Sequence, residues 1–265
     1  MARKGARLVV SPDDRARPTS RQGGEPPAWE PEVWVEEHAA PAAAPEGRRA
    51  EGRPDRTVPA PVHDELRQAV GSRRAEAADR RMAEAVTAYE RDRYRDALRL
   101  LKPLAEAAPT APAVRELYGL TLYRLGRWAA AIKELEAFHA LTGSYDQHPV
   151  LADCHRAAGH RREVERVWEE LRRASPPAGV LAEGRIVVAA TRADAGDLAG
   201  AIELLERSRA KVRSPRLDHL RQWYALADLY ERAGDVPRAR ALFRSVLDHD
   251  PSLFDTAERI SALGG

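Results

Sequence analysis

The chain has 265 residues, with 43 lysines and arginines against 41 aspartates and glutamates, so its net charge is only +2. This balance argues against a dedicated nucleic-acid-binding protein, which normally carries a strong basic excess. The single cysteine, Cys154, excludes an intramolecular disulfide, and no apolar run reaches the length of a signal peptide or a membrane span, so we expect a cytoplasmic protein without a membrane partner.

Residues 1–63 are the first predicted segment, a disordered tail. They hold ten of the 19 prolines, and such a composition cannot bury enough apolar surface to offset chain entropy. Within the tail, the stretch PPAWEPEVWVEE at 26–37 places Trp29 and Trp34 among glutamates. Because buried tryptophans dominate small interfaces, we expect Trp29 and Trp34 to act as anchors, either on this protein's own folded part or on a partner.

A leading helix is predicted over residues 64–77, which are rich in helix formers, and a recurring helix pair follows from 78 to 251. The clearest copy is WYALADLYERAGDVPRARALFRSVLDHDP, residues 223–251. It fits W-x2-L-[GA]-x2-Y, then A-x3-F, then a closing proline, at Trp223, Leu226, Ala227, Tyr230, Ala239, Phe243 and Pro251.

Three positions of this pattern recur in five copies. The small residue of the first helix is Ala85, Gly119, Ala152, Ala189 and Ala227. The small residue of the second helix is Ala97, Ala131, Val164, Ala201 and Ala239. The turn residue is Asp92, Gly126, Gly159, Gly196 and Gly234, at spacings of 34, 33, 37 and 38 residues. Small side chains let two helices approach closely, and a tight helix exit favours a residue that tolerates positive φ.

The last predicted element covers residues 252–265. Its apolar residues, including Phe254, Ala257 and Ile260, recur at helical spacing, and the segment ends on glycines. We expect it to be the solvent-facing capping helix that a repeat array needs at its end.

Over residues 78–262 the sequence resembles the tetratricopeptide-repeat family, and its Ala/Arg-rich composition looks like that of soluble repeat proteins from GC-rich bacteria. The resemblance implies an all-α, right-handed superhelical solenoid of helix pairs. It also implies a concave groove, lined mainly by the first helix of each pair, that binds a peptide or protein partner.

If the first helices face such a groove, its polar and aromatic lining is predicted from the register of the repeats. The predicted lining is Tyr89, Glu90, Glu116, Tyr123, Arg124, Asp153, Arg156, Asp194, Tyr224, Asp228 and Arg232. Acidic residues such as Glu134 and Glu136 lie opposite arginines at helical spacings and are expected on solvated faces.

The sequence carries no set of groups that indicates catalysis. Cys154, His155 and His160 lack the paired ligands of a zinc site, and His155 falls on a packing position of the repeat. The phosphate-binding, hydrolase and metalloprotease motifs are absent. We therefore expect no enzyme activity, no metal and no cofactor.

The leading hypothesis is a non-catalytic scaffold that binds a protein or peptide in its groove, with its own Trp29/Trp34 segment as a gate. The alternative is an RNA-associated helical repeat protein. That protein would use the basic arm at 15–21 and the arginine cluster RSRAKVRSPR at 207–216.

Overall fold

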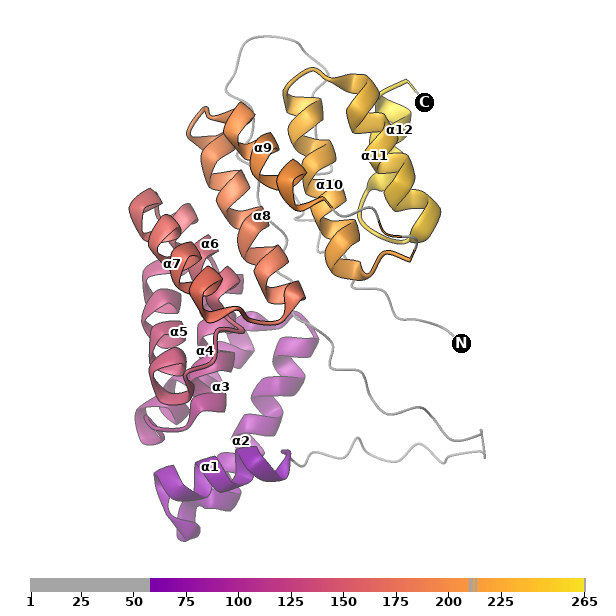
Figure 1. Ribbon diagram of the computed structural model, residues 1–265. Helices are drawn as coiled ribbons and strands as arrows, with labels where there is room; N and C mark the ends of the chain where they lie inside the picture. Colours follow the sequence, from indigo (N-terminus) through magenta and orange to yellow (C-terminus); the bar gives the residue numbers. More distant parts are fainter. Residues whose placement is uncertain (1–57, 210–211, 213, 265) are drawn as a thin grey trace, which may run out of the picture. The chain divides into compact units, whose positions relative to one another are not determined.

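Every regular element in the described part of the chain is an α-helix (Figure 1). The structure is a computed structural model, and it describes residues 58–209, 212 and 214–264. Most of the predicted tail, including Trp29 and Trp34, lies outside the described residues. The chain divides after residue 158 into two compact units, called here the N-terminal unit and the C-terminal unit.

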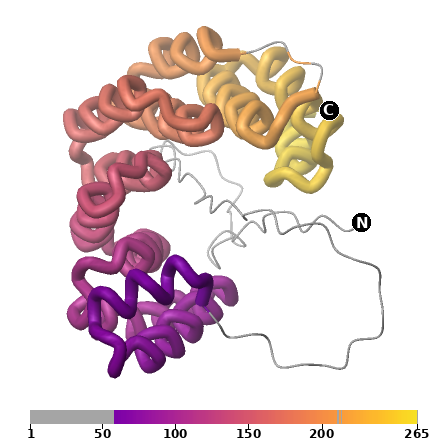
Figure 2. The backbone as a smooth tube through the Cα atoms, turned by 60° about the horizontal axis from the view of Figure 1, so that its bottom comes forward, coloured from indigo at the N-terminus to yellow at the C-terminus, as the bar shows by residue number. Residues whose placement is uncertain are grey.

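The described part of the N-terminal unit contains six helices. They are α1 (Ala60–Val70), α2 (Ser72–Glu90), α3 (Tyr94–Ala107), α4 (Pro112–Arg124), α5 (Trp128–Thr142) and α6 (His148–Ala157). Helix α2 folds back on α3, and α4 folds back on α5, so the unit is built from helix pairs (Figure 2). Alanine and leucine side chains fill most of its core.

Six helices also make up the C-terminal unit, as far as its residues are described. They are α7 (Arg161–Ala174), α8 (Ala178–Asp194), α9 (Leu198–Ser208), α10 (Leu217–Arg232), α11 (Val236–His249) and α12 (Thr256–Ala262). Here α8 pairs with α9 and α10 pairs with α11, while α12 packs on α11. Asp197 and Asp235 cap α9 and α11, because their side chains accept hydrogen bonds from the backbone N–H groups of Gly200 and Arg238.

The turn within each predicted pair has the backbone conformation that the sequence predicts. All five turn residues have positive φ: Asp92 at 58°, Gly126 at 68°, Gly159 at 77°, Gly196 at 87° and Gly234 at 78°. Asp92 is the one non-glycine among them, and aspartate is among the few residues that adopt this conformation readily. This prediction is confirmed.

The positions predicted to be small are buried in the structure. Every alanine at these positions is at most 2% exposed, and Val164 is 0% exposed. At Gly119, a Cβ atom would lie 2.7 Å from the Leu135 Cδ2 atom of α5, too close for a real contact. At these positions the sequence pattern therefore reflects the tight packing of the interior, which leaves little room for larger side chains.

The leading segment differs from its prediction. Instead of one helix over 64–77, the structure has α1 over 60–70 and a separate α2 that begins at Ser72. The break is at Gly71, whose φ of 79° and ψ of 155° are accessible almost only to glycine. The predicted capping segment at 252–265 contains a single short helix, α12.

Candidate functional site

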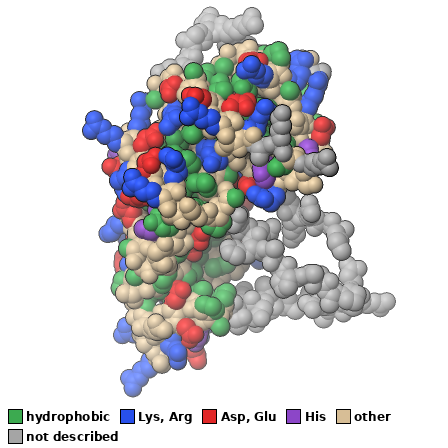
Figure 3. Space-filling model, viewed as in Figure 1, with side chains coloured by type: hydrophobic (Ala, Val, Ile, Leu, Met, Phe, Trp, Pro, Cys, Tyr) green, Lys and Arg blue, Asp and Glu red, His purple; other side chains and the backbone are tan. Residues whose placement is uncertain are grey.

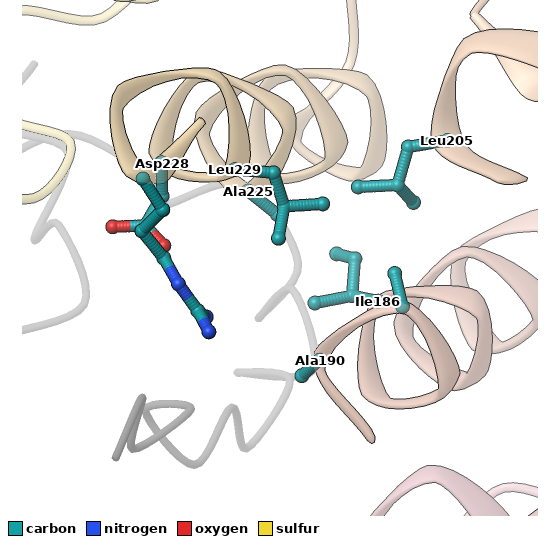
Figure 4. A pocket seen from close by; sticks show the side chains of 8 residues that line it. Ile186, Ala190, Leu205, Ala225, Asp228 and Leu229 are labelled. Carbon is teal, nitrogen blue, oxygen red and sulfur yellow. The ribbon is translucent and has the colours of Figure 1, made fainter. Parts of the chain in front are cut away.

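A pocket opens between α8 and α10, the first helices of the fourth and fifth predicted repeats (Figure 4). The pocket is shallow, because its empty volume of about 210 Å³ includes open solvent and seven of its eight lining residues are buried. Six of its eight lining side chains are apolar: Ile186, Ala189, Ala190, Leu205, Ala225 and Leu229. Asp228 and Arg232 of α10 complete the lining.

The local sequence explains why the pocket is apolar and narrow. Ile186 and Ala190 are four residues apart on α8, and Ala225 and Leu229 are four residues apart on α10, so each pair lies on one helix face. In Figure 4 the side chains of Leu229, Leu205 and Ile186 point toward one another. The alanines leave the space that larger side chains would fill.

The charged residues beside the pocket are paired with one another. Asp228 accepts a hydrogen bond from Arg259 of α12 at 2.6 Å, and Arg259 also contacts Glu231 at 2.8 Å. Arg232 lies 3.9 Å from Asp194 of α8. Burial lowers the pKa of Arg259, but the hydrogen bond and charge of Asp228 outweigh it and hold the pKa above its usual value.

The same pairing of first helices continues away from the pocket. Arg221 of α10 donates to Glu183 of α8 at 2.7 Å, and the Tyr224 hydroxyl donates to Asp255. The face of α8 and α10 therefore presents compensated charges around an apolar pocket. A ligand there would gain affinity mainly from apolar burial, because compensated charges offer little further Coulomb energy.

The remaining predicted groove residues belong to the N-terminal unit and form a separate polar group. Tyr123 donates to the buried Asp153, which also accepts from Arg156 at 2.7 Å. Glu116 accepts from Gln147 at 2.8 Å. These contacts link α4 to α6 and to the turn before α6.

At the other end of that group, Arg124 lies over the ring of Tyr94. Its guanidinium lies 4.6 Å from the centre of the Tyr94 ring and 3.6 Å from Asp92. Tyr89 is buried and packs edge-on against Tyr94, while Glu90 is exposed at the end of α2. The predicted lining thus falls into two groups, one in each unit, and neither group contains the apolar pocket floor.

Sequence reasoning identified Asp228 and Arg232 at the pocket but missed Ile186, Ala190, Ala225 and Leu229. The predicted lining contains only polar and aromatic residues, although the register that selected Asp228 also places Ala190 on the equivalent face of α8. The register therefore points to Ile186 and Ala190, at the positions of Tyr224 and Asp228, but not to Ala225 and Leu229, which each lie one residue further along α10.

The arginine cluster at 207–216 offers few uncompensated charges in its described part. Arg207, Arg209 and Arg216 pair with Glu203, Glu206 and Asp218 respectively. Basic and acidic side chains are also interspersed on the face drawn in Figure 3. This pattern gives no support to phosphate binding by the described part of the cluster.

No three His, Cys, Asp or Glu side chains among the described residues are placed to hold a metal ion. Burial, with a smaller contribution from Asp153, raises the pKa of the Cys154 thiol, which disfavours the reactive thiolate. No described helix combines the length and apolar character needed to cross a membrane.

Alkaline pH is expected to unfold the protein, because burial raises the pKa of six tyrosines. They are Tyr89, Tyr94, Tyr118, Tyr123, Tyr224 and Tyr230, and the pKa of Tyr89 reaches about 12. A raised folded-state pKa means that the folded chain holds the phenolic proton more tightly than the unfolded chain. The stabilisation is therefore complete below about pH 10 and is lost as pH rises from there toward about 12.

Tyrosinate absorbance and far-UV circular dichroism, recorded in parallel, check this expectation. Loss of helix should accompany tyrosine ionisation. Full ionisation near pH 10 with the helix signal intact would contradict the assigned burial.

Known proteins share this helical architecture. A family model described as a tetratricopeptide repeat matches residues 82–144 and 181–253, just over half of the chain. No curated protein matches the chain. Among solved structures, it is similar to the crystal structure of a thermophilic TPR protein from Thermus thermophilus, with 21% sequence identity and a TM-score of 0.57. The match covers 70% of this chain and 98% of the other.

Proposed function

This chain belongs to the tetratricopeptide-repeat family, whose members are generally non-catalytic scaffolds for protein interactions. From that premise we propose that it binds a peptide through the pocket between α8 and α10. The bound peptide inserts one branched apolar side chain into the pocket. The rest of the peptide lies along the compensated polar face of α8 and α10.

The observation that carries this proposal is the apolar floor between two first helices. In this family the first helices line the binding groove, and α8 and α10 hold that position in the fourth and fifth predicted repeats. Ile186, Ala190 and Leu229 give the floor its apolar character. An apolar floor of this kind suits the end of a leucine, isoleucine or valine side chain.

The test selects peptides from a phage-displayed random library against the full-length chain and measures their affinity for pocket variants. Ala190→Arg places a charge in the floor and is expected to weaken the selected peptides by about 100-fold, since burying an unpaired charge is costly. Ala241→Arg is the matched control, because Ala241 is exposed on α11. Equal affinity for the two variants would remove the pocket as the binding site.

Salt is expected to have little influence on this binding. Because the charges beside the pocket already pair with one another, the dissociation constant should change by less than about threefold between about 0.05 and about 0.5 M NaCl. Fluorescence anisotropy of a labelled selected peptide measures the change. A fall in affinity of tenfold or more would mean that uncompensated charges drive recognition.

The proposed gate is the chain's own segment at 26–37. Its support is the sequence alone: Trp29 and Trp34 are large apolar anchors in an otherwise polar and proline-rich stretch. Tethered to the chain, such a segment competes with an external peptide at high effective concentration. The full-length Trp29→Ala/Trp34→Ala variant should therefore bind selected peptides about tenfold more tightly than the unaltered chain. Unchanged affinity would remove the gate and leave the pocket proposal intact.

A further inference from the structure

Helix α1 lies on two first helices of the N-terminal unit. It packs along α2 and reaches the beginning of α4. Figure 1 shows it crossing α2 rather than continuing it. Two polar contacts fix its position: His63 Nδ1 lies 2.6 Å from Asp79 Oδ2, and Glu65 accepts a hydrogen bond from the backbone N–H of Ala113 at 3.0 Å.

The face that α1 covers corresponds, in repeat register, to the face that forms the pocket in the C-terminal unit. Met82 lies three residues before the small position Ala85, as Ile186 lies three residues before Ala189. Ile186 lines the pocket and is 6% exposed, and Met82 is 4% exposed and belongs to the core cluster that includes Leu66 of α1. Asp79, which contacts His63, corresponds in the same way to Glu183, which contacts Arg221.

The attachment of α1 is slight for a helix of eleven residues. Leu66 is its only buried residue, while Val62, Ala69 and Val70 are partly buried against the core. Its His63–Asp79 contact is partly exposed to solvent. Few buried contacts and solvent-accessible polar contacts are the features of a segment that opens locally, without unfolding of the rest.

The junction with α2 is built to bend. Gly71 joins the two helices at φ 79° and ψ 155°, and a Cβ atom there would meet no other atom within 4 Å. Gly71 is held by two backbone hydrogen bonds, to Arg67 and from Arg74, and glycine has access to many other conformations once these open. The break separates α1 from the helix pair that follows.

From these observations we infer that the inner face of α2 and α4 is a helix-binding site, and that α1 occupies it as a displaceable segment of the same chain. The partner that displaces α1 is an amphipathic helix with the same pattern. It carries apolar residues at the places of Val62, Leu66 and Ala69, and a carboxylate at the place of Glu65, which caps the N-terminus of α4.

Hydrogen exchange on the unaltered full-length chain is the first test. Backbone amides of α1 should exchange about tenfold or more faster than those in the middle of α2, in a local opening that leaves α2–α5 protected. Equal protection of α1 and α2 would overturn the inference, because α1 would then open only with the whole unit.

The second test uses a synthetic peptide of residues 58–71 as the probe. The full-length Leu66→Asp variant releases α1, so it should bind the labelled peptide, while the unaltered chain binds it about 100-fold more weakly because α1 competes in the same chain. A peptide that itself carries Leu66→Asp should bind neither protein. Gln68→Asp, on the exposed side of α1, is the matched control and should behave like the unaltered chain.

Two outcomes of the peptide test would overturn the inference. One is a Leu66→Asp protein that keeps its remaining helix content but binds no peptide. The other is a loss of helix content far beyond α1, which would make α1 an integral part of the fold. Neither test involves the pocket between α8 and α10, so failure here leaves the proposed peptide pocket untouched.

Discussion

Replacing Phe243 with alanine is expected to lower the free energy of unfolding of the C-terminal unit by about 3–5 kcal/mol. Phe243 is 0% exposed, and its ring packs edge-on against Tyr224 of α10 with 5.4 Å between the ring centres. Its removal leaves a cavity between α10 and α11 that the surrounding helices close only in part. Urea titration followed by tryptophan fluorescence and circular dichroism measures the loss, since Trp223 lies in the same unit.

The matched control for Phe243→Ala is Leu217→Ala. Leu217 is 44% exposed at the start of α10, so its truncation should cost well under about 1 kcal/mol. If the two variants lost similar stability, the α10–α11 interface would not be the packing element that the burial of Phe243 implies. Phe243→Ala should also weaken peptide binding, because Phe243 packs against α10 and α10 provides half of the residues that line the pocket.

Glu134→Ala is expected to destabilise the N-terminal unit by about 3 kcal/mol, because it leaves a guanidinium without its carboxylate in a poorly solvated place. Arg115 and Glu134 form an ion pair between α4 and α5, with only 16% and 10% of their side chains exposed. Arg115 also donates to the Pro109 carbonyl oxygen at 3.0 Å. Thermal unfolding of the full-length variant measures the loss.

A double substitution distinguishes the net contribution of this ion pair to stability from the destabilisation caused by removing only one of its partners. Arg115→Met/Glu134→Leu removes both charges and keeps similar volume, so it should recover most of the stability that Glu134→Ala loses. A double variant as unstable as the single one would indicate that Glu134 acts through contacts other than Arg115.

Glu134 also marks a limit of the sequence prediction, which placed it on a solvated face although it is only 8% exposed. The spacing of charges along one helix predicts the partners on that helix. It does not predict a partner 19 residues away on the preceding helix, as Arg115 is. The burial of Glu134 depends on how α4 and α5 are rotated against each other, and that rotation is a property of packing.

The turn and packing positions could be predicted because their causes are local. A residue that ends a helix with positive φ is nearly always glycine or one of a few other types, so Gly126, Gly196 and Gly234 could be predicted as turn residues from the sequence. The pairing of charged side chains between helices has no such local cause. Asp228 with Arg259, and Glu183 with Arg221, join residues 31 and 38 positions apart on different helices.

Helix α1 escaped full prediction for a related reason. Its residues favour a helix, and that part was predicted. Gly71 was visible in the sequence, but glycine inside a helical pattern is compatible with a tolerated residue or with a break. Only the packing of Leu66 against the core of the N-terminal unit distinguishes the two.

In both units the helices that pack together are close neighbours along the chain, and this has a consequence for how the protein folds. Contacts between near neighbours close short loops, so a helix pair can form before distant parts of the chain have met, and folding should be fast for a protein of this length. Nucleation can begin at more than one pair and spread along the array. A lesion in one pair then weakens its neighbours most and reaches distant pairs least, so a damaged chain loses its structure in stages.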